Sequence, residues 1–227
     1  MNEVNIPYHV GLIMDGNRRW ADANGKKSTD GHKAGAERIL SLAPYIFKKG
    51  VSYLSIYAFS TENFNRAASE VDYLMGLILK FFKERINELH EQNIKVIFSG
   101  RKEPLNEKVW EVMLKVTHMT KDNTGGTLNI CLNYGGRAEL IDAFNKIKTS
   151  GEEITEESFS KYLYQDLPDL DFIIRTSGEI RLSNFMLWES SYAELYFPKV
   201  CFPDFDEKEF DKSLVEYSER KRRFGGN

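Results

Sequence analysis

The sequence predicts an α/β fold with one central, mostly parallel sheet of about six strands flanked by helices. Three observations lead to this prediction. Short apolar segments alternate along the chain with longer segments of helical spacing. The short segments are almost continuously apolar, as in parallel strands covered on both faces. The chain has 227 residues and no internal repeat or Pro-, Gly- or Ser-rich linker, so residues 1–227 are expected to form a single domain.

The predicted strands share a short length, an apolar centre and polar or turn-forming flanks. The first runs into an Asp-Gly-Asn turn, and the fourth follows a Gly-Gly turn. In chain order the predicted strands are Tyr8–Met14, Tyr53–Phe59, Ile94–Phe98, Thr127–Tyr134, Leu170–Thr176 and Ala193–Phe197.

The predicted helices carry apolar residues at three- and four-residue spacing. The first ends at Lys48-Lys49-Gly50, where cations lie near the last carbonyl groups and a glycine follows. The second has a broad apolar face. In chain order the predicted helices are Gly31–Gly50, Glu70–Gln92, Leu105–Thr120, Arg137–Lys148, Glu156–Tyr164 and Glu207–Arg223.

The composition is that of an ordinary globular protein, with 41% hydrophobic residues, 29% charged residues and a formal net charge of −3. This acidic balance opposes nucleic-acid binding, and the basic run ERKRRFGG is interpreted as the last turn of a helix. The two cysteines lack CxxC spacing, which favours a reduced protein. Without a signal-peptide pattern or an apolar run of roughly 20 residues, we expect a cytoplasmic location.

Polar and charged residues follow the ends of several predicted strands. Because ligands bind beyond the carboxyl ends of parallel strands, we expect these residues to meet at one edge of the sheet. Taken singly, Asp15 reads as a helix cap, Arg175 as a surface ion pair and Glu194 as an exposed position at the start of a strand. The set comprises Asp15, Gly16 and Asn17 after the first strand, Ser60 to Asn63 after the second, Asn133 to Arg137 after the fourth, and Arg175, Arg181 and Ser183 after the fifth.

Carboxylates and arginines at one edge together predict a diphosphate site with Mg²⁺. Magnesium prefers one or two carboxylates plus phosphate oxygens and water. Arginine matches phosphate oxygens in paired hydrogen bonds. The sequence contains no GxxxxGKS/T, GxGxxG after a strand or GxSxG motif, and its four histidines lack the spacing of a zinc site.

The motifs HVGLIMDGNRRWA, GHKAG, YAFSTENFNR, LNICLNYGGR, IIRTSGE, RLSNF, YAELYF and RRFGG resemble the cis-prenyltransferases, specifically the undecaprenyl diphosphate synthase group. The resemblance runs from His9 to Gly226. It implies an enzyme that ionises an allylic diphosphate primer and adds isopentenyl diphosphate to it, forming a Z double bond at each step.

The resemblance also implies residue roles. Asp15 would bind Mg²⁺ and the leaving diphosphate, Glu194 would make the second Mg²⁺ contact, and Asn63 would accept the proton, although an amide is a poor base. Substrate-binding roles are implied for Gly16, Asn17, Arg18, Arg19, Trp20, His32, Ser60, Thr61, Glu62, Phe64, Arg66, Arg175, Arg181 and Ser183.

The family places the growing prenyl chain in an apolar tunnel beside the long helix. Ala58 falls where longer-chain enzymes carry a small residue, so a long product is expected, one that partitions to the membrane. The tunnel wall would comprise Ile56, Ala58, Leu74, Leu77, Ile78, Phe81 and Ile130, each of which could equally be ordinary core. The resemblance further implies a homodimer, with Arg223 reaching towards the partner's site.

Four positions depart from the family pattern, and they leave alternatives open. Ser28 replaces an arginine, Ile180 a histidine, Phe64 a tryptophan and Ala67 a proline. These changes fit a paralogue that makes a short-chain or irregular prenyl diphosphate. A non-catalytic partner subunit is a further alternative, which the presence of Asp15, Asn63 and Glu194 opposes.

Overall fold

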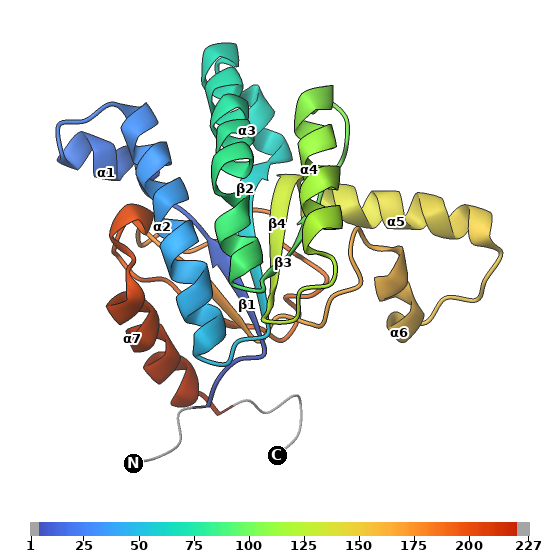
Figure 1. Ribbon diagram of the computed structural model, residues 1–227. Helices are drawn as coiled ribbons and strands as arrows, with labels where there is room; N and C mark the ends of the chain where they lie inside the picture. Colours follow the sequence, from blue (N-terminus) through green and yellow to red (C-terminus); the bar gives the residue numbers. More distant parts are fainter. Residues whose placement is uncertain (1–4, 222–227) are drawn as a thin grey trace.

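Six parallel strands form one sheet in the computed structural model, which describes residues 5–221 (Figure 1). The strand order is β3-β4-β2-β1-β5-β6, and every pairing between neighbouring strands is parallel. The predicted α/β fold is therefore confirmed, with strand ends shifted by one or two residues. The strands are β1 (His9–Ile13), β2 (Tyr53–Ser60), β3 (Lys95–Ser99), β4 (Thr127–Tyr134), β5 (Phe172–Arg175) and β6 (Glu194–Tyr196).

The helices follow the predicted pattern with three differences. The first helix was not predicted, because only Ala21 of its residues is buried and it shows no apolar stripe. The segment predicted as Glu156–Tyr164 divides into two short helices, and the last helix ends at Ser218 instead of Arg223. Arg223 itself lies outside the described residues. The helices are α1 (Asn17–Ala23), α2 (Ser28–Lys48), α3 (Ala68–Glu91), α4 (Glu107–Thr120), α5 (Gly136–Ser150), α6 (Glu156–Phe159) and α7 (Glu207–Ser218), with 3-10 turns η1 (Thr61–Asn65), η2 (Ser160–Tyr162) and η3 (Phe202–Asp204).

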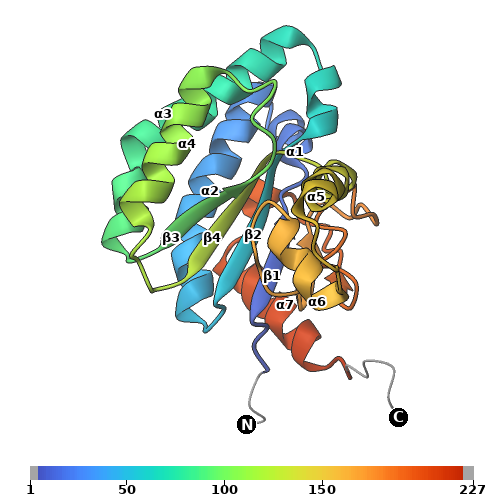
Figure 2. The same ribbon diagram turned by 90° about the vertical axis from the view of Figure 1, so that its right-hand side faces the viewer.

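The two faces of the sheet are covered differently. Residues of β1 alternate between two apolar clusters: Val10 and Leu12 pack in one and Ile13 in the other. The first cluster is closed by α2, α3, α4 and α7. On the other side, where Figure 2 shows α5 and α6, the second cluster is closed mainly by connecting segments that contribute Leu170 and Phe185. Within residues 5–221, no helix has the length and apolar character needed to cross a bilayer.

A chain of buried polar side chains joins four strands across the sheet. His9 Nε2 lies 2.8 Å from Ser55 Oγ, Asn129 Nδ2 donates to the same oxygen at 3.0 Å, and Ser99 Oγ donates to Asn129 Oδ1 at 2.9 Å. Buried polar groups are costly unless they are paired, so a slipped strand would leave several of them without partners. These hydrogen-bonded side chains thereby help to set the register of the strands. The register in turn decides which residues reach the carboxyl edge of the sheet.

Two buried carboxyl groups, Glu139 and Glu189, lie on the second face. Glu139 accepts hydrogen bonds from the Tyr134 hydroxyl and from Tyr164 N, whereas Glu189 Oε2 has no hydrogen-bond partner among the described residues. Burial and then the charge of Glu139 raise the pKa of Glu189 to about 8. Glu189 is therefore the member of the pair that keeps its proton at neutral pH.

The raised pKa of Glu189 predicts a stability that falls as the pH rises. The folded state holds the proton up to about pH 8, whereas an ordinary glutamate loses it near 4.5. The free energy of unfolding should decrease across that interval with a limiting slope of about 1.4 kcal/mol per pH unit. Glu189→Gln should show a flatter profile, measured by urea denaturation between pH 5 and pH 9. Parallel profiles for the two proteins would contradict this assignment of the proton.

Candidate active site

The carboxyl edge of the sheet brings Asp15 and Arg175 together. Strand β1 lies between β2 and β5, and its pairing places Ile13 beside Arg175 at the end of β5. Chain connections diverge to either side of β1, and such a point is where open α/β sheets form their binding crevice. Asp15 lies two residues beyond the end of β1, and it lines the cavity at this crevice.

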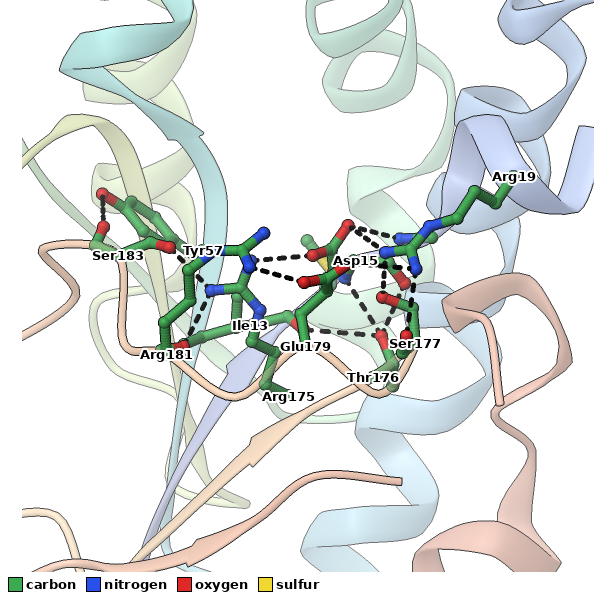
Figure 3. A network of polar contacts seen from close by, with 12 residues as sticks. Ile13, Asp15, Arg19, Tyr57, Arg175, Thr176, Ser177, Glu179, Arg181 and Ser183 are labelled. Carbon is green, nitrogen blue, oxygen red and sulfur yellow. Dashed lines mark hydrogen bonds and ion pairs between the residues drawn. The ribbon is translucent and has the colours of Figure 1, made fainter. Parts of the chain in front are cut away.

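The Asp15 carboxylate is held by several donors (Figure 3). Arg175 Nη2 donates to Oδ2 at 2.8 Å, Gly16 N donates to Oδ1 at 2.7 Å, and Arg19 Nη2 lies 3.5 Å from Oδ1. Burial raises the pKa of the Asp15 carboxyl, but the hydrogen bond and positive charge of Arg175 outweigh it and leave the pKa below its usual value. Asp15 is therefore an anion at neutral pH.

Arg175 connects Asp15 with the loop that follows β5. Its side chain is almost fully buried, and its Nη1 donates to Arg181 O at 2.8 Å and to Ser183 Oγ at 2.7 Å. Its Nε has no hydrogen-bond partner among the described residues. A guanidinium with such fixed partners orients Asp15 on one side and the Arg181–Ser183 loop on the other.

Arg19 and Gly16 shape the turn beyond Asp15. Arg19 donates to Ser177 O at 3.1 Å and pairs with Glu179 at 3.2 Å, which ties α1 to the loop after β5. Gly16 has a φ of 98°, and a Cβ there would lie 2.9 Å from Cys201 Sγ. Both the left-handed backbone and the close contact require glycine at this position.

Asn17 explains the glycines of the GHKAG motif. A Cβ at Gly35 would lie 2.4 Å from Asn17 Oδ1, and one at Gly31 would lie 2.0 Å from Asn17 O. Glycine at both positions therefore lets α2 approach α1 closely. Asn17 Oδ1 is buried and has no hydrogen-bond partner among the described residues, although its Nδ2 donates to Met14 O at 3.3 Å.

Glu70 gathers two arginines beside His32. Glu70 Oε1 lies 3.0 Å from Arg66 Nη1 and 3.8 Å from Arg18 Nη1. Burial, followed by the charge of Arg66, lowers the pKa of His32, so its imidazole is neutral at pH 7. The ring nitrogen Nε2 of His32 is buried without a partner among the described residues.

Two adjoining cavities meet at this site. A polar cavity of about 620 Å³ reaches from Asp15 to Asn184, and an apolar cavity of about 120 Å³ extends from it between the sheet and helices α2 and α3. All seven residues predicted for the tunnel wall line the apolar cavity. The residues that line both cavities are Met14, Asn17, His32, Ala58, Phe59 and Leu74.

The structure brings together most of the predicted site residues. The following line the polar cavity: Asp15, Asn17, His32, Ser60, Glu62, Asn63, Arg66, Arg175, Arg181 and Ser183. Gly16, Arg18, Arg19 and Thr61 lie beside these residues without lining it. Trp20 instead donates its Nε1–H to Asp204 at 2.7 Å, and Phe64 packs against Phe59 with ring centroids 4.9 Å apart.

Glu194 lies at the opposite edge of the sheet. It is the first residue of β6 and pairs with Phe172, the first residue of β5, whereas Arg175 is the last. Parallel strands run in one direction, so a residue that starts a strand cannot reach the edge where the strands end. The prediction that Asp15 and Glu194 share one Mg²⁺ is therefore wrong within a single chain, and Glu194 forms an ion pair with Arg220 at 3.9 Å.

Two residues that line the polar cavity with polar side chains were not predicted. Tyr57 reaches the Ser183 loop, with its hydroxyl donating to Ser183 O at 3.2 Å. Asn184 has a φ of 66° and donates its Nδ2–H to Glu62 Oε1 at 2.8 Å. Asparagine tolerates the left-handed region, and its place directly after Ser183 was the available signal.

The described residues contain no group of three or more histidine, cysteine or acidic side chains that could hold a metal ion. On the wall of the polar cavity, the anionic carboxylate of Asp15 lies beside Arg175. The arrangement fits an anion whose charge is shared between guanidinium groups and a cation bound through the anion itself. The fold and the site together define a class: an α/β enzyme that binds an anionic group with an apolar tail.

Comparison with known proteins identifies the family. The family described as "Putative undecaprenyl diphosphate synthase" matches residues 13–225. An isoprenyl transferase of Fusobacterium nucleatum is 51% identical over 99% of this chain and 98% of its own length, and one of Thermotoga maritima is 45% identical over 97% of both. The chain belongs to this family of isoprenyl transferases.

Comparison with solved structures supports the same family assignment. Lavandulyl diphosphate synthase from Lavandula x intermedia, solved with dimethylallyl diphosphate, superposes with a TM-score of 0.92 at 33% identity over 97% of this chain and 98% of that one. A "probable undecaprenyl diphosphate synthase" from Campylobacter jejuni gives 0.84 at 31% identity, over 97% and 99% of the two chains. The family resemblance seen in the motifs is thus confirmed.

Asp15→Ala should lower isoprenyl transfer by a factor of about 100 to 1,000, the typical loss when one preorganised electrostatic group is removed. The variant also leaves buried Arg175 without its acidic partner, so circular dichroism and thermal unfolding should confirm that the fold persists. Asp142→Ala is the matched control, because it removes the acidic partner of Arg101, and neither residue lines the polar cavity. Near-normal turnover by Asp15→Ala in a radiolabel transfer assay would refute the role of this carboxylate.

Proposed function

We propose that the chain is a Mg²⁺-dependent cis-prenyltransferase, which condenses isopentenyl diphosphate with an allylic diphosphate primer to give a Z-prenyl diphosphate. The observation that carries this proposal is the junction of the two cavities. The polar cavity holds Asp15, Arg175 and Arg181, and the apolar cavity begins at Ala58 and Leu74, which line both. A prenyl diphosphate has the same division into a charged head and an apolar tail.

The chemistry needs stabilisation of a leaving group. When the allylic C1–O bond breaks, its electron pair goes to the diphosphate and an allylic cation remains. Arginine donors fixed in advance stabilise the developing negative charge because they need not reorganise during the reaction. Arg66 and Arg181 line the polar cavity, and Arg175 holds the backbone that carries Arg181 and Ser183.

The residues at Asp15 fit a magnesium ion bound together with a diphosphate. Mg²⁺ needs one or two carboxylates when phosphate oxygens and water complete its shell, and Asp15 is an anion on the cavity wall. When bound, the ion would neutralise charge on the departing diphosphate. The side chain of Asp15 would hold it, while Gly16 N and Arg175 fix the orientation of the carboxylate.

The apolar cavity supports an elongating activity. Ile56, Ala58 and Ile130 contribute the sheet side and Leu77 and Phe81 the α3 side. Such walls exclude water from the allylic cation, which water would otherwise trap as an alcohol. The small side chain at position 58 leaves room for chain growth past the first additions, which favours a long product.

A paralogue with a short or irregular product is the second candidate. Ser28 opens α2 without the guanidinium expected there, and of the nearby cations Lys26 lies over the Trp20 ring at 4.6 Å and Arg18 lies 3.8 Å from Glu70. Ile180 is 78% exposed and offers no metal ligand. The similarity to lavandulyl diphosphate synthase supports keeping this candidate.

One assay distinguishes these candidates. The purified protein would be incubated with Mg²⁺, labelled isopentenyl diphosphate and, separately, dimethylallyl, geranyl or farnesyl diphosphate, and the products sized after dephosphorylation. Regular elongation gives a ladder that grows by one isoprene unit. Product from dimethylallyl diphosphate alone would instead identify irregular coupling, and no product under any condition would favour a partner subunit.

Ala58→Leu should shorten the product. The larger side chain would enter the apolar cavity between Ile56 and Leu74 and obstruct a growing chain. We expect the main product to be several isoprene units shorter, with the first addition proceeding within about threefold of the normal rate. Ala36→Leu, on the helix side of the same cavity, provides a comparison for general crowding. An unchanged product distribution in Ala58→Leu would remove this residue from the path of the chain.

A further inference from the structure

The side-chain oxygen of Asn63 already accepts a hydrogen bond from the backbone of Ser60. Asn63 Oδ1 accepts a hydrogen bond from Ser60 N at 3.1 Å, which closes the 3-10 turn η1. A carboxamide oxygen is also a far weaker base than a carboxylate. These two facts indicate that the Asn63 side chain stabilises the turn η1. They leave open which group removes a proton during condensation.

Glu62 is the neighbouring residue, and it lines the polar cavity. Among the described residues that line this cavity, Asp15 and Glu62 are the only carboxylates. Asp15 is committed to Arg175 and to Gly16 N. Glu62 has no ion-pair partner among the described residues. Its carboxylate oxygens accept hydrogen bonds from two neutral donors, the Asn184 amide and the Thr61 hydroxyl.

Asn184 holds Glu62 in position. Its Nδ2 donates to Glu62 Oε1 at 2.8 Å, its Oδ1 accepts from Arg137 N at 2.8 Å, and its backbone oxygen accepts from Gly136 N at 2.7 Å. Asn184 therefore links three loops at the carboxyl edge: η1 after β2, the start of α5 after β4, and the Arg181–Ser183 loop after β5. A side chain tied at both its oxygen and its nitrogen is a rigid support for the carboxylate.

The charge of Glu62 is maintained in the folded state. Burial raises the pKa of its carboxyl, but hydrogen bonds from its own backbone N–H, from Asn184 and from the hydroxyls of Ser60 and Thr61 outweigh it and lower the pKa. The side chain is thus an anion at neutral pH, with lone pairs still available on both oxygens.

We infer that Glu62 is the proton acceptor in the condensation and that Asn184 is the residue that positions it. The inference rests on the proposed function. The allylic C1–O bond breaks and its electron pair leaves with the diphosphate. The C3–C4 double bond of isopentenyl diphosphate supplies the pair for the new C4–C1 bond, which leaves a cation at C3. The C2–H bond then breaks, its pair forms the C2–C3 double bond, and the proton passes to the Glu62 carboxylate.

Charge favours Glu62 over the other base in the cavity. His32 has a ring nitrogen without a hydrogen-bond partner among the described residues, but burial opposes its protonation, which would also place a cation beside Arg66. Glu62 becomes neutral when it accepts a proton. Its negative charge also stabilises the cation at C3 before the proton leaves, which an uncharged imidazole or amide cannot do.

The test compares variants of the full chain in single turnovers with Mg²⁺, an allylic primer and isopentenyl diphosphate carrying hydrogen or deuterium at C2. Glu62→Gln keeps the hydrogen bond to Asn184 but removes the base, so the condensation rate should fall by about 100-fold or more. The KM for both diphosphates should stay within about threefold. Deuterium at C2 should slow Glu62→Gln more than it slows the unmodified protein, because proton removal has become rate-limiting.

Further variants separate catalysis from structure. Glu62→Ala should be partly rescued by formate, and Glu62→Asp should retain more activity than Glu62→Gln. Asn63→Ala should lower the rate through η1 without an increased isotope effect or formate rescue. Asn184→Gly keeps a residue suited to the left-handed backbone but lacks the amide, so it should show a slower rate and an increased isotope effect.

Clear results would overturn the inference. A Glu62→Gln rate within threefold of the unmodified protein, or an unchanged isotope effect in this variant, would remove Glu62 as the base and favour the diphosphate of the substrate. An increased isotope effect or formate rescue in Asn63→Ala would return the role to Asn63. Failure of the unmodified protein to form any condensation product would instead refute the proposed function.

Discussion

The contact between Asp15 and Arg175 organises the carboxyl edge of the sheet. An almost fully buried guanidinium needs a compensating charge, and the half-buried carboxylate that supplies it comes from the neighbouring strand in parallel register. The pairing has a chemical consequence as well as a structural one. It keeps an acid ionised in a crevice and leaves a second guanidinium nitrogen to hold the loop after β5. The binding site is thereby built around a charge pair that the fold itself must satisfy.

Backbone strain gathers around this contact. Ser177, Ser183 and Asn184 have φ values of 75°, 51° and 66°, and all three lie in the segment between β5 and β6. Each left-handed residue other than glycine costs of order 1 kcal/mol or more and persists only where its surroundings hold it. Here those surroundings are Arg19, Arg175 and Glu62, which bind Ser177, Ser183 and Asn184 respectively. Side chains from helix α1, turn η1 and strand β5 therefore keep the loop in one conformation before any ligand arrives.

The sequence predicts the strands and the polar cavity well because two simple rules apply. Continuous apolar segments identify parallel strands, and their carboxyl ends place Asp15, Glu62, Arg175 and Arg181 in one cavity. The same rule indicates that Glu194, at the start of β6, faces the other edge, and the family motif alone led to its assignment as a metal ligand. Helix α1 could not be predicted, because a helix that buries only Ala21 has no apolar periodicity.

The loop residues could not be predicted because their roles depend on conformation. Asn184 acts through a left-handed backbone and through hydrogen bonds to residues far along the chain, and neither leaves a pattern in local composition. The sequence also did not predict which residues cover the second face of the sheet. Phe185 and Met186 lie in a segment with no regular periodicity, yet both are almost fully buried in the apolar cluster on that face. Tertiary contact, rather than local propensity, decides such positions.

At the junction of the two cavities, the proposed reaction needs separate groups to stabilise the positive allylic cation and the negative diphosphate. In the proposed reaction the allylic cation would form where Ala58 and Phe59 line both cavities, in largely apolar surroundings that would exclude water. In this proposal the arginines would stabilise the departing diphosphate, and the Glu62 carboxylate would stabilise the cation and accept its proton. If the two carboxylates of the polar cavity were adjacent, the arginines would neutralise both and no base would remain. Asp15 follows β1 and pairs with Arg175, whereas Glu62 follows β2 and accepts a hydrogen bond from Asn184, so each acid has a different partner and, in the proposed reaction, a different task.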